Sequence, residues 1–217
     1  MKIAVLASGI LTAALVGSAH AALLTEGFND VSTLAGSGWV RTNNSVPVGN
    51  DWFQGNSGVF ASQAGAADAY IGNNFLSTSG DSGVVDAWLI SPELSLAGGG
   101  LLTFYTRTAD PGFGDKLEVR FSSGSSSSTA GFTTLLLTIG DGPTPYPDSD
   151  WGSFSALLPS AASGRFAFRY TVADALNADY IGLDSVNVAA VPEPSTYALL
   201  ALGVAGMSLV RRHRRGA

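Results

Sequence analysis

The sequence predicts an all-β protein, an antiparallel two-sheet jelly-roll sandwich, and three of its features favour that class. The apolar runs are short, several alternate with polar residues, and a helical repeat is hard to find between the two ends of the chain. Stretches rich in Gly, Ser, Pro and Asp separate the runs, as turns would. Many short strands without crossover helices favour two packed sheets.

Two segments carry the clearest strand pattern. Residues 116–121 alternate strictly between polar and apolar, and every second residue of 165–172 is large and apolar. Such alternation is typical of antiparallel strands with one buried face. Further strands are expected over residues 23–28, 84–90, 101–107, 133–139, 153–158 and 180–188, with turns at 97–100, 122–128 and 141–150.

Residues 1–21 have the features of a secretory signal peptide. Lys2 supplies a positive start, an uncharged apolar run over 3–16 follows, and the small residues Ala19 and Ala21 form an A-x-A cleavage site. The alternative is an uncleaved anchor, but the run is shorter than the roughly 18 residues of a spanning helix. Residues 22–190 then form a single exported domain, long enough to bury a core.

Residues 191–217 carry a Pro-Glu-Pro motif, an apolar stretch over 196–210 and a basic cluster, in that order. The residues concerned are Pro192, Glu193, Pro194, Arg211, Arg212, Arg214 and Arg215. The positive-inside rule keeps those arginines cytoplasmic and places the domain across the inner membrane. As a single hydrophobic helix the stretch covers about 22 Å, short of the roughly 30 Å bilayer core, which suits a temporary anchor.

These three parts resemble a PEP-CTERM sorting signal. In that family the signal is thought to be recognised by an exosortase, a membrane transpeptidase-like enzyme of Gram-negative bacteria that make exopolysaccharide. The resemblance implies that the helix holds the protein in the inner membrane transiently and is then removed. The domain would end on the cell surface or in the extracellular matrix. The alternative is an ordinary C-terminal anchor preceded by a Pro-bearing linker.

Composition narrows the functions open to the domain. Residues 22–191 hold 6 basic and 16 acidic residues, so their net charge is −10, which disfavours nucleic acid and anionic lipid as partners. Both histidines, His20 and His213, lie in the end segments, and cysteine is absent. Catalysis by His or Cys, zinc sites, iron–sulfur clusters and disulfides are excluded for the processed domain.

A series of short motifs along the domain resembles the choice-of-anchor J family. The motifs are Glu26-Gly27-Phe28, Gly38-Trp39, Asp51-Trp52, Ala87-Trp88-Leu89-Ile90-Ser91-Pro92, Asp115-Lys116-Leu117-Glu118-Val119 and Tyr180-Ile181-Gly182-Leu183-Asp184-Ser185-Val186. Their order covers nearly all of residues 23–188. That family is similar to cleaved-adhesin and MAM-type jelly rolls and occurs with varied anchoring tails, PEP-CTERM among them. The resemblance implies the same sandwich here.

Calcium is the one ion that the residues favour. Glu26, near the first strand, and Asp184, in the last, would meet where a jelly roll brings its terminal strands together. Carboxylates and backbone carbonyls are the oxygen ligands that calcium takes. Related jelly rolls often carry a structural calcium near the chain ends, so the resemblance implies the same. The alternative is that both side chains cap turns or accept backbone N–H bonds.

Trp52 is the expected ligand-binding residue, because it follows Asp51 in a polar, Gly-rich stretch that predicts an exposed ring. Trp88 lies in an apolar strand and is expected to be buried in the core. A glycosidase needs only two carboxylates, but Asp115 and Glu118 are three apart on a strand and would point to opposite faces. No catalytic residue is therefore predicted.

The sequence as a whole predicts an exported, exosortase-sorted sandwich with a non-catalytic binding or structural role, tied to exopolysaccharide or biofilm. Two alternatives stay open. One is a carbohydrate-binding module for exopolysaccharide, and the other is a cryptic glycoside hydrolase.

Overall fold

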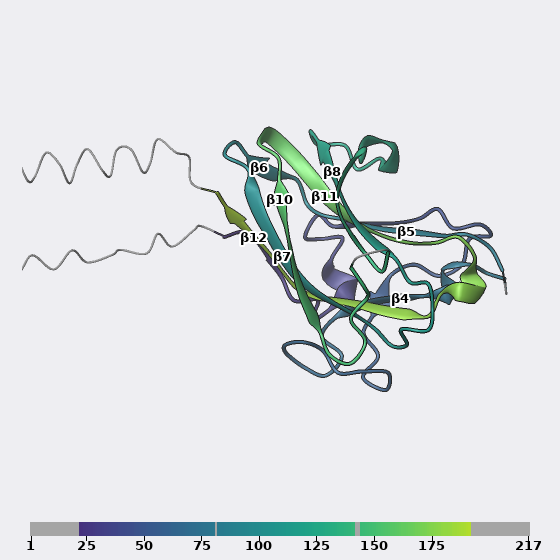
Figure 1. Cartoon of the computed structure of the whole chain (residues 1–217). Coiled ribbons are helices and arrows are strands. Elements are labelled where there is room, and N and C mark those ends of the chain that lie inside the picture. Colours follow the sequence, from purple (N-terminus) through teal and green to yellow (C-terminus); the bar gives the residue numbers. More distant parts are fainter. Residues whose placement is uncertain (1–21, 81, 142–143, 192–217) are drawn as a thin grey trace, which may run out of the picture.

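The computed structural model describes residues 22–80, 82–141 and 144–191 (Figure 1). The predicted cleavage residues Ala19 and Ala21, the tail helix and the sorting residues 192–215 lie outside these ranges. The described part contains twelve β-strands and four short 3-10 turns. None of the helical turns within it has the length or the apolar character to span a bilayer.

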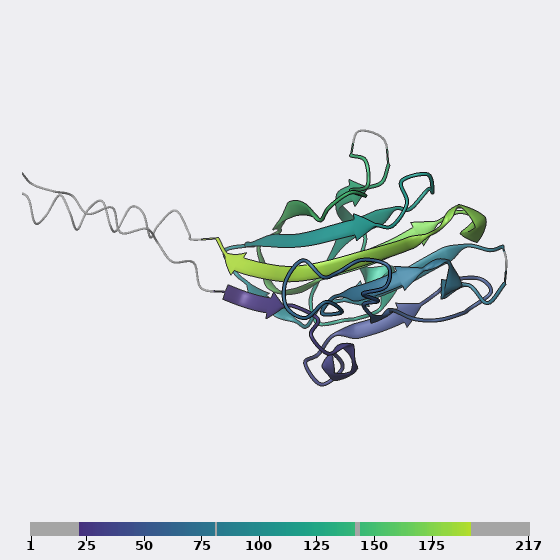
Figure 2. The same cartoon turned by 90° about the horizontal axis from the view of Figure 1, so that it is seen from below.

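The strands form two antiparallel sheets that lie face to face (Figure 2). Sheet A has the order β10 (Gly152–Leu158), β7 (Gly100–Thr108), β12 (Tyr180–Ala190), β4 (Ile71–Asn74) and β3 (Phe53–Gln54), and β1 (Ala22–Glu26) also pairs with β12. Sheet B has the order β2 (Val40–Asn43), β5 (Val85–Ile90), β11 (Ala161–Val172), β8 (Leu117–Ser123) and β9 (Thr134–Ile139), and β6 (Leu94–Leu96) also pairs with β11. The 3-10 turns are η1 (Val31–Thr33), η2 (Phe75–Ser77), η3 (Thr129–Gly131) and η4 (Ala175–Asn177). The predicted all-β sandwich is confirmed.

The eight strands predicted from the sequence are all present, with shifts of a few residues at their ends. The four missed strands, β2, β3, β4 and β6, have only two to four residues each. Two to four residues are too few to show a period of two. β4 also has the sequence Ile-Gly-Asn-Asn, which favours a turn by composition, although three of its residues are buried.

The core lies between the sheets and follows from the alternation along the strands. Phe166, Phe168 and Tyr170 of β11 point inward and are fully buried, as the period of two requires. Phe104 of β7 meets Phe168 from the opposite sheet, with ring centroids 4.8 Å apart in an edge-to-face arrangement. Burial of these aromatic rings is the main source of stability in a domain without disulfides.

Aromatic rings also cover the outer face of sheet A, above two glycines. Gly72 and Gly182 are directly paired in the β4–β12 ladder. A Cβ on Gly182 would lie 2.8 Å from the Trp151 ring and 2.9 Å from that of Phe60. Because these two glycines have no side chain, the segment before β4 can pack directly on the sheet.

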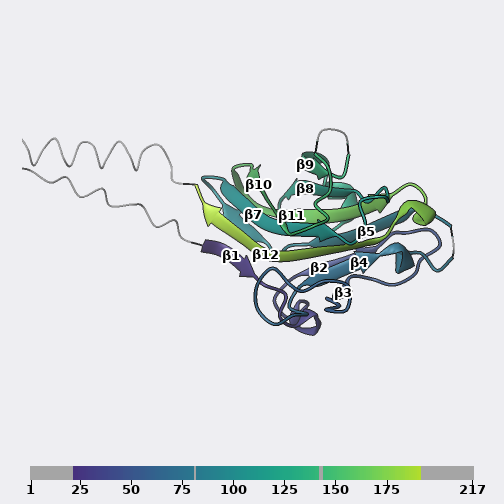
Figure 3. The same cartoon turned by 60° about the horizontal axis from the view of Figure 1, so that its bottom comes forward.

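The two ends of the sandwich differ in what they carry (Figure 3). Ala22 of β1 pairs with Ala189 of β12, so the start and the end of the described domain lie at one end, called the tail end here. β12 begins at Tyr180, which pairs with Asn74 at the opposite end. The loops that connect strands at this opposite end form the candidate site.

Candidate functional site

Four connections meet at the end of the sandwich opposite the tail end. They join β2 to β3, β4 to β5, β7 to β8 and β11 to β12, and they enclose a cleft of about 570 Å³. Loops held on a rigid scaffold are the common place for binding residues. We call this cavity the loop-end cleft.

Apolar side chains form the walls of the loop-end cleft. Phe75 and Leu76 come from η2, Phe113 from the β7–β8 loop and Leu176 from η4. Their exposed fractions run from 42% for Phe113 to 63% for Leu176. Large apolar residues gathered around one cavity at this exposure indicate an interaction site more than single exposed ones do.

A few polar groups stand among these walls. The side-chain amide of Asn50 and the hydroxyl of Ser79 make no hydrogen bond within the part of the chain that the structure describes, so both are open to a ligand. Asp179 adds a carboxylate to the lining. Its pKa is raised by burial and by the negative charge of Asp115. An apolar cavity with a few convergent polar groups is the usual form of a ligand site.

Backbone contacts hold the β2–β3 connection against η2. The N–H groups of Gly49 and Asn50 donate to the carbonyls of Ser77 at 2.8 Å and Leu76 at 2.7 Å. A Cβ at Gly49 would lie 2.3 Å from the Leu76 carbonyl oxygen, so only glycine permits this approach. Asn74 caps η2 by accepting from the Leu76 N–H at 3.0 Å. The cleft is thus preformed on this side.

Asp115 joins the other two loops beneath the cleft. Its carboxylate accepts from the hydroxyls of Thr108 at 2.6 Å and Tyr170 at 2.5 Å, and from the Asp179 N–H at 2.9 Å. Asp115 is only 2% exposed, and burial raises its pKa despite these three bonds. Burial and the charge of Asp115 also raise the pKa of Tyr170 well above its ordinary value. These bonds fix Asp179 in the cleft wall.

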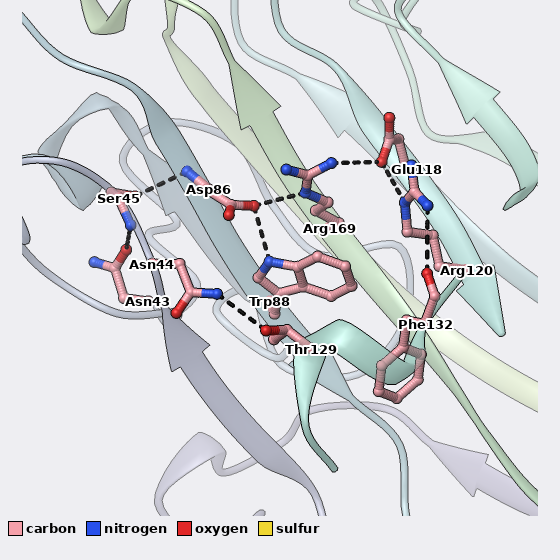
Figure 4. A network of polar contacts seen from close by, with 10 residues as sticks. All are labelled: Asn43, Asn44, Ser45, Asp86, Trp88, Glu118, Arg120, Thr129, Phe132 and Arg169. Carbon is pink, nitrogen blue, oxygen red and sulfur yellow. Dashed lines mark hydrogen bonds and ion pairs between the residues drawn. The ribbon is translucent and has the colours of Figure 1, made fainter. Parts of the chain in front are cut away.

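A second polar cluster lies on the outer face of sheet B, away from the cleft (Figure 4). Arg169 of β11 bonds to Asp86 of β5 at 2.6 Å and to Glu118 of β8 at 3.2 Å, and Glu118 also accepts from Arg120 at 2.6 Å. Burial alone would raise the pKa of Glu118, but the bonds and charges of Arg120 and Arg169 outweigh it and lower that pKa. The four charges satisfy one another across three strands.

Trp88 lies beneath this cluster. Its indole N–H donates to Asp86 at 2.8 Å, and the Arg169 guanidinium stands 5.1 Å from the ring centroid. Phe132, which follows η3, packs on the same ring with centroids 5.9 Å apart. Trp88 is therefore buried as predicted, but on the outer face of sheet B and not between the sheets.

Glu26 and Asp184 lie on the adjacent strands β1 and β12. Glu26 pairs with Val186, two residues after Asp184. Glu26 accepts from the Phe28 N–H at 2.8 Å, and Asp184 accepts from the N–H groups of Gln63 at 2.9 Å and Ala64 at 3.1 Å. Burial raises the pKa of Asp184, although its backbone bonds act in the opposite direction.

The hydrogen bonds of these two carboxylates match the alternative that they accept backbone N–H groups. No cluster of three or more acidic or histidine ligands occurs among residues 22–80, 82–141 and 144–191. Calcium takes about six to eight oxygen ligands, so backbone carbonyls would have to complete the set. Calcium binding stays a prediction.

The expectation of an exposed ring at Trp52 was wrong. Its side chain is 1% exposed and belongs to the core between the sheets. The physical reason is that Trp52 immediately precedes β3, whose pairing with β4 continues sheet A through a stretch that is polar in composition. A polar sequence context did not indicate an exposed position here.

Asp115 and Glu118 lie on opposite sides of sheet B, as their spacing predicted. Asp115 bonds to the inward-facing Tyr170, whereas Glu118 belongs to the outer cluster. These two carboxylates therefore do not face a common substrate position, which is the arrangement that a glycosidase needs.

Comparison with known proteins adds the sorting signal and the fold relatives. Residues 190–215 match the PEP-CTERM protein-sorting motif. This confirms the prediction of a sorting motif in the tail, and the motif implies an exported protein that an exosortase sorts. No curated protein sequence matches the chain.

The sandwich is similar to cleaved adhesin domains of Lys-gingipain from Porphyromonas gingivalis W83. The K1 domain is 25% identical with a TM-score of 0.58, and the alignment covers 78% of this chain and 98% of that domain. The K3 domain is 23% identical with a TM-score of 0.60, and the alignment covers 79% and 99%. The cleaved-adhesin-like jelly roll expected from the sequence is confirmed.

Sequence reasoning missed the loop-end cleft. The available signal was weak: Phe75 and Leu76 stand between Asn-Asn and Ser-Thr-Ser, and Phe113 stands between two glycines. Such apolar residues in turn-forming stretches have no alternating pattern that would give them an inward position. That four separate connections would bring them together depends on the topology, which no local pattern contains.

Proposed function

We propose that this protein is an envelope or matrix component whose sandwich binds glycan in the loop-end cleft. The observation that carries the proposal is the placement of the cleft at the end opposite the sorting tail. A domain held by its C-terminal end would present the cleft away from the membrane. Processing by an exosortase would leave the same cleft free on the surface or in the matrix.

The chemistry of the loop-end cleft supports a glycan ligand. A sugar ring has apolar C–H faces that stack on aromatic side chains, and Phe75 and Phe113 offer two such rings. Its hydroxyls need donors and acceptors, which Asn50, Ser79 and Asp179 provide. The similarity to adhesin domains agrees with a binding role but does not indicate which ligand is bound.

The exopolysaccharide of the producing cell is the glycan we propose, with biofilm structure as the consequence. Exosortase sorting supports this choice, because the resemblance ties such tails to bacteria that make exopolysaccharide. Asp115 and Glu118, the pair considered for the catalytic alternative, lend it no support, since they face away from one another.

Binding is tested with the processed protein purified from its native host. Isothermal titration against exopolysaccharide from the same strain should give saturable binding without release of reducing sugar. Phe113→Ala should weaken it at least about tenfold, because loss of an aromatic ring that anchors a ligand costs about 1.4 kcal/mol or more. Leu157→Ala is the matched control, since Leu157 is 70% exposed but lies in β10 near the tail end.

Unchanged binding in Phe113→Ala would exclude the cleft as the site. Turnover of the polysaccharide would favour the alternative that the protein is a glycoside hydrolase.

Fractionation of the host cells with intact-mass measurement tests the sorting proposal separately. A processed protein should begin at Ala22, end near 192–195 and lie outside the inner membrane. A full-length C-terminus in the inner membrane would contradict it.

A structural calcium at Glu26 and Asp184 stays part of this proposal. Removal of metal with EDTA should then lower the melting temperature of the wild-type protein, and added calcium should restore it. Glu26→Gln should remove this response. A melting temperature that EDTA leaves unchanged would contradict calcium binding.

A further inference from the structure

Acidic residues outnumber basic ones in and around the loop-end cleft. Asp179 lines the cleft, Asp115 lies beneath it, and Asp174 caps η4 by accepting from the Leu176 N–H at 3.1 Å. Asp110 belongs to the same loop as Phe113 and accepts from the Gly112 N–H at 2.7 Å. Four carboxylates therefore stand in or next to the walls.

No cation of the described domain stands in the cleft beside Asp179, and Lys116, which follows Asp115, lines a neighbouring cavity together with Asp174. The lining of the loop-end cleft contains neither Lys nor Arg. The six basic residues of 22–191 are all engaged elsewhere: Lys116 pairs with Asp141, Arg120 with Glu118, and Arg169 with Asp86 and Glu118. Arg41, Arg107 and Arg165 donate to the carbonyls of Trp52, Asp148 and Ser91.

We infer that the loop-end cleft takes a glycan without acidic groups, such as a neutral or amino-sugar polymer, and rejects uronates and sulfated sugars. The inference rests on the proposed glycan binding and adds the charge class of the ligand. A carboxylate or sulfate bound between Phe75 and Phe113 would lie close to Asp179 with no partner of opposite charge. Partial burial weakens the screening of this repulsion by solvent.

The apolar walls strengthen this selection. An acidic sugar would also lose hydration on entering between exposed rings, without gaining a charged hydrogen bond in return. A neutral hydroxyl loses less, because a carboxylate such as Asp179 is a strong acceptor for it. Discrimination thus comes from an unfavourable contact with the wrong ligand as well as from a favourable one with the right ligand.

The test compares three probes on the processed wild-type protein at low salt: a neutral glucan oligosaccharide, a chitosan oligosaccharide and an oligogalacturonate. The glucan, the chitosan or both should bind at least about tenfold more tightly than the oligogalacturonate. This ratio should shrink at high salt, because screening weakens a repulsion between charges but leaves a steric mismatch unchanged.

Asp179→Asn should raise the affinity for oligogalacturonate and so reduce the difference in affinity between the probes. Glu93→Gln is the matched control, because it makes the same change of charge at an exposed residue outside the cleft. It should leave all three affinities unchanged. The melting temperature of each variant checks its fold. Oligogalacturonate bound as tightly as the neutral probe would overturn the charge class and leave glycan binding standing. Absence of binding by all three probes would overturn both.

Discussion

Two carboxylates three residues apart, Asp115 and Glu118, occupy opposite environments in this molecule. Asp115 lies beneath the loop-end cleft, where its carboxylate accepts from two hydroxyls and one N–H and has no cation among these partners. Glu118 lies on the outer face of sheet B between two guanidinium groups. Burial raises the pKa of the first, while the two arginines lower that of the second against the effect of burial.

The difference shows what each cluster does for the fold. The strands under Glu118 are already joined by the β5–β11 and β11–β8 ladders, so its ion pairs add to contacts that exist without them. The loops joined by Asp115 share few other bonds, one of which is the Gly114 N–H to the Asn177 carbonyl at 2.7 Å. Asp115 should therefore matter more for stability and for the shape of the cleft.

The largest effect is expected from Asp115→Ala. This change leaves the buried Tyr170 hydroxyl without its acceptor and the Thr108 hydroxyl with only the Tyr180 carbonyl at 3.3 Å, which should cost about 3 kcal/mol of unfolding free energy. Urea denaturation measures this loss. Asp115→Asn keeps the shape and one acceptor oxygen, so it should cost less than half as much. A loss below about 1 kcal/mol in Asp115→Ala would contradict the role given to this residue.

A smaller effect is expected from Arg169→Met. It leaves Asp86 and Glu118 without a shared cation, but both retain some exposure, so the loss should be about 1–2 kcal/mol. Adding Asp86→Asn should recover part of this loss, because Asp86 is the carboxylate left without a cation, whereas Glu118 keeps its pair with Arg120. If the two changes are simply additive, the cluster does not act as a unit.

Asp115 and Glu118 should make opposite contributions to the pH dependence of the free energy of unfolding. Each contribution has a slope of at most about 1.4 kcal/mol per pH unit. The pKa of Asp115 is raised on folding, so its contribution is present below 3.8 and is lost as the pH rises through the folded pKa. The pKa of Glu118 is lowered, so its contribution is present above 4.5 and is lost as the pH falls through the folded pKa.

Denaturation curves of Asp115→Asn and Glu118→Gln, measured over this acidic range, give these slopes. Relative to the wild type, Asp115→Asn should gain stability as the pH rises and Glu118→Gln should gain as it falls. The same direction for both variants would refute the contrast between the two sites.

The smallest effect on stability is expected at the wall of the cleft. Leu176 is 63% exposed, so Leu176→Ser should change the free energy of unfolding by less than about 0.5 kcal/mol. It should nevertheless weaken glycan binding, because it removes part of an apolar wall. A stability loss above about 1 kcal/mol would show that the residue supports the fold instead.

The sequence predicted the sandwich well because its long strands carry their own evidence. The alternation in 165–172 places Phe166, Phe168 and Tyr170 inward whatever the rest of the chain does, and the structure confirms this. The same rule correctly separated Asp115 from Glu118. These predictions succeeded because the period of a strand is a local property.

The candidate site could not be predicted in the same way. Trp52 was misplaced because exposure depends on pairing between β3 and β4, a contact between distant parts of the chain. The cleft depends on four connections that meet only through the topology of the two sheets. The PEP-CTERM motif could be predicted from the sequence because it is a contiguous pattern at residues 190–215 and does not depend on the fold.

The position of β12 has a consequence for the order of events during export. It is the last strand of the domain, yet it pairs with β1, β4 and β7 and therefore lies in the interior of sheet A. A chain that crosses the membrane from its N-terminus cannot complete sheet A until residue 190 has emerged. The sorting signal follows at once, so completion of the fold and arrival of the tail at its processing enzyme would coincide.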